Sequence, residues 1–385
     1  MGANIGRSIV IYRAEHAYSS HACITQTPEG EWLVAFAQSL QRTPHRHPPS
    51  DPQFLNFVTR SRDRGQSWET PQVAPSYDWY GVEVPGIAAL PSGDVLLNQW
   101  RFLWYPTDLA RKLHARGERS CFVRGAWRDW RPPQSEADWD GHPFPYARAD
   151  GGAWVHLSHD GGRTWEHTVE VAIDPYRGAF SPKGAVQLDG GDLLLALGSH
   201  NYDPLHASFV VRSRDGGRSW ERPVEVARQE GKEFSEPSVA QLSSGKLLLV
   251  SREEIEGHLH LSTSEDGGET WGVPRELPIY GFPSHCVSLG DGRAVVVYGR
   301  LRAPYGIRAV VSEDEGDSWS DEIVIRDDFR DGNLGYPAVI EYQPGQLFTA
   351  YYGEDPDGVT CIQGTYFDVY HATYLPFGSR PAAEG

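Results

Sequence analysis

Short apolar segments recur along the whole chain, and most of them come in pairs joined by a glycine turn. Each pair starts at a polar or turn-forming residue, runs through one apolar segment, turns at a glycine and returns through a second. Six such pairs occupy residues 21–36, 84–100, 182–198, 236–252, 283–300 and 336–352. Paired apolar segments around glycine are typical of antiparallel β-hairpins. Because one hairpin cannot cover its own apolar face, six similar units predict a repeat fold in which neighbours cover one another.

A second pattern, S-x-D-x-G-x-[ST]-W, follows each of the first five hairpins. Its copies are residues 61–68, 158–165, 213–220, 264–271 and 312–319. The aspartate can accept hydrogen bonds from nearby backbone N–H groups, the glycine tolerates positive φ, and the tryptophan can anchor the turn on a core. The last four copies start 55, 51 and 48 residues apart, whereas the first step is 97 residues. That long step predicts one repeat unit plus an insertion at about residues 106–151.

This pattern resembles the Asp-box, or BNR repeat, of the sialidase-like β-propellers, and the resemblance covers nearly the whole chain. It implies an all-β, six-bladed β-propeller in which the boxes are hairpin turns on the outer rim, away from the active site. We expect one domain over residues 1–385, with the insertion in blade 2. The sixth hairpin lacks a box, so we expect the apolar segment at residues 8–12 to close the ring. The insertion is interpreted as a lid or an oligomer contact.

Composition and charge restrict the partners. The formal net charge is −17, which makes nucleic acid and anionic membranes unfavourable partners. No long apolar run follows Met1, so the sequence indicates neither a signal peptide nor a membrane span. The compartment stays unassigned, with the cytoplasm as the default expectation. The four cysteines are scattered without metal-binding spacing, so we expect buried thiols and neither a metal nor a cofactor.

The innermost strands of a propeller start at its central axis, where ligands bind. The residue nine positions before each turn glycine therefore samples this funnel. It is, in order, His21, Val84, Pro182, Glu236, Pro283 and Tyr336. Three of the six can titrate or act as a nucleophile, which is more than a purely structural ring requires.

Glu236 and Tyr336 fall in register with the catalytic glutamate and tyrosine of sialidases, and the resemblance implies these roles for them. It also implies that Asp51, in the loop after the first hairpin, is the acid/base residue. The chemistry is coherent, because a sialic acid carries a carboxylate on its anomeric carbon. A neutral tyrosine approaches that carbon without repulsion if a glutamate takes its proton.

Arginine binds a substrate carboxylate through two parallel hydrogen bonds, and sialidases use three arginines for this purpose. The resemblance places Arg252 at one of these positions and Arg302 near a second, with Arg300 as the competing assignment. The third position departs from the family. Sialidases begin the first blade with Arg-Ile-Pro, whereas this chain has Ser20 at the arginine position, followed by His21. Either the carboxylate is held differently or the substrate is not a sialic acid.

The histidines add an alternative chemistry. His21 is predicted to face the funnel, and His285 begins the fifth hairpin at a similar depth. Related propellers that act on uronic-acid glycans use histidine and tyrosine as acid/base groups. Three hypotheses therefore stand: an exo-acting, retaining glycosidase that releases a terminal acidic sugar, a uronate-directed lyase or glycosidase that uses His21 and Tyr336, and a non-catalytic carbohydrate-binding propeller. Each predicts a glycan or acidic-sugar partner, and a homo-oligomer is compatible with all three.

Overall fold

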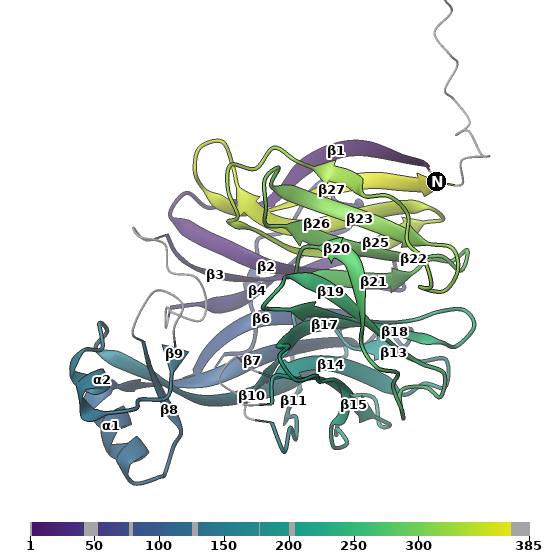
Figure 1. The fold of residues 1–385 in the computed structure, drawn as a ribbon. Helices are drawn as coiled ribbons and strands as arrows, with labels where there is room; N and C mark the ends of the chain where they lie inside the picture. The colour runs from purple at the N-terminus through teal and green to yellow at the C-terminus, as the bar shows by residue number, and fades with distance from the viewer. Residues whose placement is uncertain are drawn as a thin grey trace, which may run out of the picture.

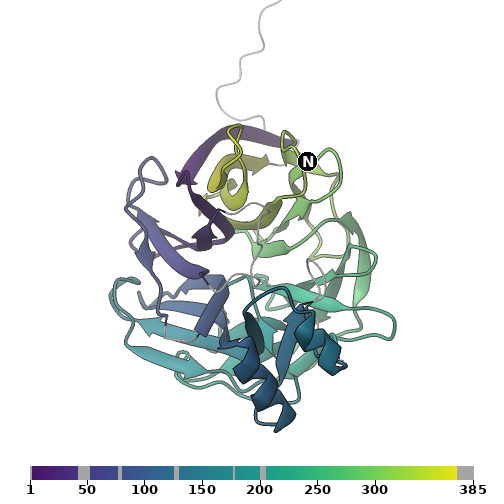
Figure 2. The same cartoon turned by 90° about the vertical axis from the view of Figure 1, so that its left-hand side faces the viewer.

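The computed structural model describes residues 2–41, 53–76, 80–124, 130–176, 178–199 and 205–370. Within these ranges the chain forms 27 strands and two helices. The strands build six antiparallel sheets, which surround a central axis (Figure 1); Figure 2 looks down this axis onto the ring. The all-β, six-bladed propeller predicted from the repeats is therefore confirmed.

Among the first three blades, blades 2 and 3 have more than four strands. Blade 1 contains β2 (Ala17–Gln26), β3 (Trp32–Leu40), β4 (Leu55–Ser61) and β5 (Gln72–Val73). Blade 2 contains β6 (Tyr80–Ala89), β7 (Val95–Pro106), β10 (Tyr146–Ser158) and β11 (His167–Glu170), with β8 (Cys121–Arg124) and β9 (Trp130–Arg131) at one end of β10. Blade 3 contains β12 (Ala179–Phe180), β13 (Val186–Gln187), β14 (Leu193–Ser199), β15 (Ser208–Ser213) and β16 (Val224–Ala227).

The other three blades have four strands each. Blade 4 contains β17 (Phe234–Gln241), β18 (Leu247–Glu253), β19 (His258–Ser264) and β20 (Arg275–Tyr280). Blade 5 contains β21 (Ser284–Ser288), β22 (Ala294–Arg300), β23 (Gly306–Ser312) and β24 (Ile323–Arg326). Blade 6 contains β25 (Leu334–Gln343), β26 (Gln346–Glu354), β27 (Thr360–Tyr370) and β1 (Gly2–Tyr12).

The N-terminal strand closes the ring, as predicted. β1 pairs antiparallel with β27, and Figure 1 shows the two strands side by side in purple and yellow. The Ser8 and Thr365 hydroxyl oxygens lie 2.9 Å apart across this pair. The strand is longer than the predicted residues 8–12. Joining the two ends of the chain in one sheet leaves no open seam between the first and last blades.

Buried apolar side chains fill the space between neighbouring blades. Trp32 of blade 1 is fully buried, and its ring centre lies 4.9 Å from that of Phe348 in blade 6. Leu194 of blade 3 belongs to one cluster with Val239 and Leu247 of blade 4. Each sheet therefore covers the next, which is the packing that the repeated hairpins require.

Each of the five S-x-D-x-G-x-[ST]-W turns leads into the outermost strand of its blade. The turns connect β4 to β5, β10 to β11, β15 to β16, β19 to β20 and β23 to β24. In the second copy Asp160 accepts hydrogen bonds from the Thr164 N–H at 2.8 Å and from the Thr164 hydroxyl at 2.6 Å. Ser158 accepts the Gly162 N–H at 2.8 Å. Trp165 then packs against the core cluster that blades 6, 1 and 2 share. Because the strands alternate in direction, these turns lie on the face opposite the start of each inner strand.

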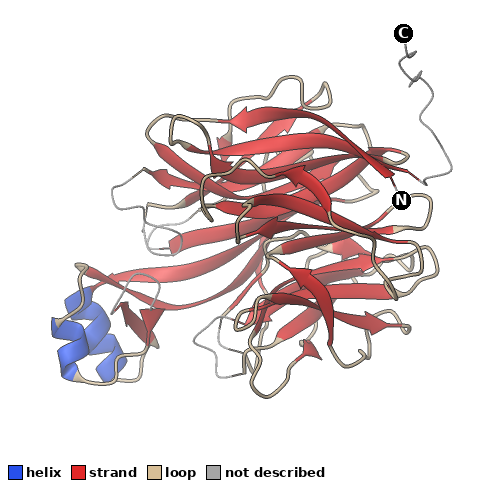
Figure 3. Ribbon diagram, turned by 45° about the horizontal axis from the view of Figure 1, so that its top comes forward, coloured by secondary structure: helices blue, strands red, loops and turns tan. Residues whose placement is uncertain are grey.

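The segment between β7 and β10 forms a small structure of its own. It contains α1 (Thr107–Ala115), β8, β9 and α2 (Glu136–Asp140), and Figure 3 shows the helices standing apart from the blades. Ala110, Cys121 and Trp139 are buried in its separate core. β7 runs back toward the start of β6, so this segment projects from the face where the inner strands begin (Figure 1). Both helices fall well short of the length needed to cross a membrane within the described ranges.

Candidate active site

Four inner strands carry the same backbone irregularity at the funnel position. His21, Val84, Glu236 and Tyr336 have φ values of 57°, 49°, 44° and 49°. Each coincides with a shift in the pairing of its inner strand with the next strand. Residues other than glycine rarely adopt this left-handed conformation, and such strain concentrates at functional sites. In four blades, the backbone irregularity therefore falls at the same position that the glycine spacing selected.

Blades 3 and 5 have a proline at this position, namely Pro182 and Pro283. The proline ring holds φ near about −65°, so neither residue can form the left-handed bulge. In these blades the neighbouring polar side chains, Lys183 and His285, contact blade 6 instead.

Tyr336, Glu236 and Arg252 form the centre of the site. The Tyr336 hydroxyl donates a hydrogen bond to Oε1 of Glu236. Nη1 of Arg252 donates to Oε2 of the same carboxylate at 2.6 Å, and Nη2 lies 2.7 Å from Oε2 of Glu254. Tyr336 is 8% exposed and Glu236 is 3% exposed. The two residues are 100 positions apart in sequence and come from blades 6 and 4, so the closed ring brings them together.

Burial sets the protonation of this group. It raises the pKa of Tyr336 well above the ordinary value, and the nearby Glu236 carboxylate raises it further. The phenol is therefore neutral near pH 7. Burial disfavours the charge of Arg252, but the carboxylates of Glu254 and Glu236 outweigh this effect and raise the pKa of the guanidinium. The site thus places a neutral phenol against a carboxylate that is held by a permanent cation.

The ring of His21 packs against that of Tyr336. The centres of the His21 and Tyr336 rings are 4.0 Å apart. Nδ1 of His21 lies 2.7 Å from the Ser20 hydroxyl, and Nε2 lies 3.8 Å from Oε1 of Glu83. Burial raises the pKa of Glu83 well above the ordinary range, although the charge of Arg148 partly opposes this. A buried carboxyl group beside a histidine and a tyrosine is a typical acid/base arrangement.

Lys183 and His285 hold the chain that follows Tyr336. Nζ of Lys183, in blade 3, donates a 2.7 Å hydrogen bond to the carbonyl oxygen of Pro337, in blade 6. Nδ1 of His285 accepts the Val339 N–H at 3.0 Å. Burial lowers the pKa of Lys183 to about 8. It also lowers the pKa of His285, and the Lys183 charge adds to that effect, so His285 is neutral near pH 7. Its ring anchors the backbone of blade 6.

The two candidate arginines of blade 5 contact Tyr280 and Glu322. The Arg302 side chain is exposed, and its guanidinium carbon lies 3.1 Å from the centre of the Tyr280 ring. Arg300 lies 3.4 Å from Glu322 and lines a different pocket, between blades 4 and 5. Asp51 lies outside the described residues. The predicted binding roles of Arg300 and Arg302, and the acid/base role of Asp51, therefore stay predictions.

Four charged residues of the site were missed by the sequence reasoning: Glu83, Lys183, Arg148 and Glu254. Glu83 and Lys183 lie one position before Val84 and one position after Pro182, so sampling both neighbours of each funnel position would have found them. Arg148 lies on β10, at the base of the insertion, with its guanidinium carbon 5.1 Å from the centre of the Trp100 ring. It belongs to no repeat and left no signal. Among the described residues, no three His, Cys, Asp or Glu side chains are placed to hold a metal ion.

Comparison with known proteins agrees with the fold. Residues 146–349 match the family of BNR repeat-like domains. The chain belongs to this sialidase-like propeller family. A sialidase of Micromonospora viridifaciens is 29% identical over 347 residues, which cover 84% of this chain and 48% of the relative. The chain thus spans about half the length of that relative.

Two solved structures illustrate the likeness of the fold. A protein of unknown function from Dyadobacter fermentans is 22% identical, with a TM-score of 0.81 over 96% of this chain and 100% of that protein. A NanB sialidase mutant of Streptococcus pneumoniae is 14% identical, with a TM-score of 0.66 over 93% of this chain and 70% of the other. At these identities the structures establish the fold of this family member, while its reaction depends on its own site.

Proposed function

We propose that this protein is an exo-acting, sialidase-like glycosidase that releases a terminal acidic sugar from a glycan with retention of configuration. The observation that carries the proposal is the hydrogen bond from the buried Tyr336 hydroxyl to the Glu236 carboxylate. A tyrosine paired with a carboxylate is an activated nucleophile, because the base accepts the phenolic proton as the oxygen attacks.

In the proposed reaction the Tyr336 oxygen attacks the anomeric carbon and its proton passes to Glu236. The bond to the leaving glycan breaks, and an acid protonates the leaving oxygen. Water then attacks the tyrosyl intermediate, and the proton on Glu236 returns to the tyrosine. Asp51 is the proposed acid/base residue. The neutral state of Tyr336 supports this route, because an anionic nucleophile would be repelled by a carboxylate on the anomeric carbon.

Arg252 is the proposed ligand of the substrate carboxylate. Its two Nη atoms bind Glu236 and Glu254. Nε of Arg252 is buried and has no hydrogen-bond partner among the described residues. A buried donor of this kind is costly to leave unsatisfied, so a carboxylate that reaches it gains a charge-assisted bond.

The second candidate function is a uronate-directed lyase or glycosidase. The contact between the His21 and Tyr336 rings, with Glu83 behind the histidine, favours it. In a lyase, one group would abstract the proton α to the uronate carboxylate, and a second would protonate the leaving oxygen. The departure at Ser20, where sialidases have an arginine, also supports this reading.

Hydrolysis of methylumbelliferyl α-sialoside by the wild type and by Tyr336→Phe tests the first function. We expect the substitution to lower kcat by about a thousandfold or more while the melting temperature is kept. Tyr12→Phe, in the outer strand of the same blade, is the matched control and should keep its activity. If the folded wild-type protein leaves the sialoside intact, a sialic acid is excluded as the sugar that is released. Uronate-terminated oligosaccharides are then tested, and unsaturated product that disappears in His21→Ala would identify the lyase.

A further inference from the structure

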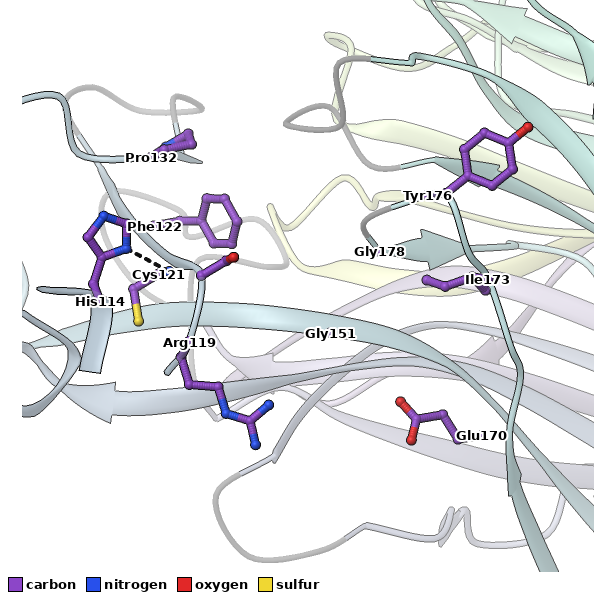
Figure 4. A pocket seen from close by; sticks show the side chains of 11 residues that line it. His114, Arg119, Cys121, Phe122, Pro132, Gly151, Glu170, Ile173, Tyr176 and Gly178 are labelled. Atoms are coloured by element: carbon purple, nitrogen blue, oxygen red, sulfur yellow. Dashed lines mark hydrogen bonds between the residues drawn. The ribbon is translucent and has the colours of Figure 1, made fainter. Parts of the chain in front are cut away.

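A cleft of about 520 Å³ separates the insertion from the junction of blades 2 and 3 (Figure 4). This size is within the range of small-molecule sites. One wall belongs to the insertion, and the other to the end of β11 and the loop that leads to blade 3. The lining residues on which the inference depends are Arg119, Ser120, Phe122, Pro132, Glu170 and Tyr176.

The chemistry of the lining fits a sugar. Arg119 and Glu170 are exposed on opposite walls at the same end of the cleft, and Phe122 lies on the insertion wall, nearer to Pro132 (Figure 4). The Tyr176 ring is stacked on Phe209 with centres 4.1 Å apart, and its hydroxyl donates to Glu225, so its position is fixed. Phe122 and Tyr176 are 3% and 5% exposed, so the exposed Arg119 and Glu170 supply the main polar contacts. Opposite charges on facing walls favour a neutral ligand with many hydroxyl groups, because a strongly charged ligand meets repulsion from one wall.

The insertion wall is held in place before any ligand arrives. Arg111 of α1 forms ion pairs with Glu136 and with Asp140, the latter at 2.9 Å, and thus joins α1 to α2. Arg131 of β9 lies 2.6 Å from Asp138. With its separate core, this segment presents a formed surface, so little conformational entropy is lost when a ligand enters.

A chain of side chains connects the cleft to the candidate active site. Phe122 lines it, and the guanidinium carbon of the buried Arg148 lies 6.0 Å from the centre of the Phe122 ring. The charge of Arg148 in turn acts on Glu83, whose carboxylate lies 3.8 Å from His21. The insertion also stands on the face where the inner strands begin, so a glycan leaving the funnel on that face meets this wall.

We propose that the cleft is a second sugar-binding subsite, which holds the neutral sugar units attached to the acidic terminal sugar. This inference rests on the proposed glycosidase function and adds a site for the leaving part of the substrate. It assigns to the insertion a role in substrate selection, with the contacts made by Arg119 and Glu170 across the cleft.

The test compares one terminal sugar on two leaving groups, methylumbelliferone and lactose. The double variant Arg119→Ala/Glu170→Ala should lower kcat/KM for sialyllactose by about tenfold, which is the loss expected for two hydrogen bonds. Its kcat/KM for the methylumbelliferyl sialoside should change by less than about twofold. Arg116→Ala, on the same segment but outside the cleft, is the control and should change neither. Equal losses on both substrates, or an unchanged value for sialyllactose, would overturn the subsite.

A direct binding measurement separates failure of the subsite from failure of the proposed function. If folded wild type cleaves neither sialoside, saturation-transfer NMR is recorded with lactose, cellobiose and xylobiose. The subsite is supported when a disaccharide signal is present in wild type and Arg116→Ala and is lost in the double variant. It is overturned when none of the three disaccharides gives a signal that depends on Arg119 and Glu170.

Discussion

Lys183 is a buried cation that joins two blades across the ring, and replacing it with methionine probes what this charge costs the fold. The side chain is 3% exposed, and its Nζ donates to the Pro337 carbonyl oxygen at 2.7 Å. Lys183→Met keeps most of the apolar volume and removes the charge and the hydrogen bond. It thereby separates the cost of burying the ammonium group from the benefit of the contact with blade 6.

Burial lowers the pKa of Lys183 from 10.5 to about 8, which corresponds to about 3 kcal/mol against keeping the charge in the folded chain. The hydrogen bond from a charged donor contributes about 1.5–3 kcal/mol in the opposite direction. At pH 7 the two effects nearly cancel, so we expect the free energy of unfolding of the variant to lie within about 2 kcal/mol of the wild-type value. The two proteins should still differ in how this free energy changes with pH. Between the folded and unfolded pKa values the unfolded chain binds more protons, so the stability of the wild type rises with pH.

Urea unfolding at about pH 7.5 and about pH 9.5 measures this difference. Over that interval the wild type should gain about 2 kcal/mol relative to Lys183→Met. The comparison removes the contributions of other groups that titrate in both proteins. Lys112→Met, which changes an exposed lysine on α1, is the control and should follow the wild type.

Parallel pH dependence of Lys183→Met and wild type would refute the reasoning, because it would mean that Lys183 titrates alike in the folded and unfolded chains. Under the proposed function the variant should also lose about tenfold in kcat, because the backbone after Tyr336 loses its anchor. A variant that is as stable as the wild type but less active would indicate that the buried charge is kept for function.

Three other substitutions test the carboxylate–arginine network and the outer turns. Arg252→Lys keeps the charge but loses the Nε–H that is proposed to bind the substrate carboxylate, so KM for the acidic sugar should rise about tenfold; an unchanged KM would contradict a role in binding. Burial raises the pKa of Glu83, so the folded chain keeps a proton that the unfolded chain releases above an ordinary pKa of 4.5, and stability falls as pH rises through this region. Glu83→Gln should therefore weaken the fall in unfolding free energy between about pH 5 and about pH 7, and equal slopes would exclude a buried neutral carboxyl group. Asp215→Ala removes the acceptor of four hydrogen bonds in the third outer turn and should cost about 1–3 kcal/mol in urea unfolding, whereas unchanged stability would mean that water replaces these bonds.

The repeats were readable in the sequence because the interactions behind them are local. A glycine turn or an aspartate that bonds to residues three and four positions later acts within a few residues. Repetition at nearly constant spacing therefore indicated the number of blades and the funnel positions, and the unboxed sixth hairpin pointed to the N-terminal strand. The same spacing selected Glu236 and Tyr336, which the structure places in direct contact.

Side chains that meet across the ring or come from outside the repeats were decided by the tertiary structure. Glu83 and Lys183 lie one position from the sampled residues, and the bulge or proline in each inner strand determines which neighbour reaches the site. The positions of Arg148 and of the cleft depend on the insertion. The insertion contains no sequence repeat from which these positions could be predicted. Arg300 has the right residue type near the right register; the structure pairs it with Glu322, and its role in binding stays a prediction. Sequence spacing places a residue along a strand, but only the packing of six sheets around one axis determines which side chains share a site.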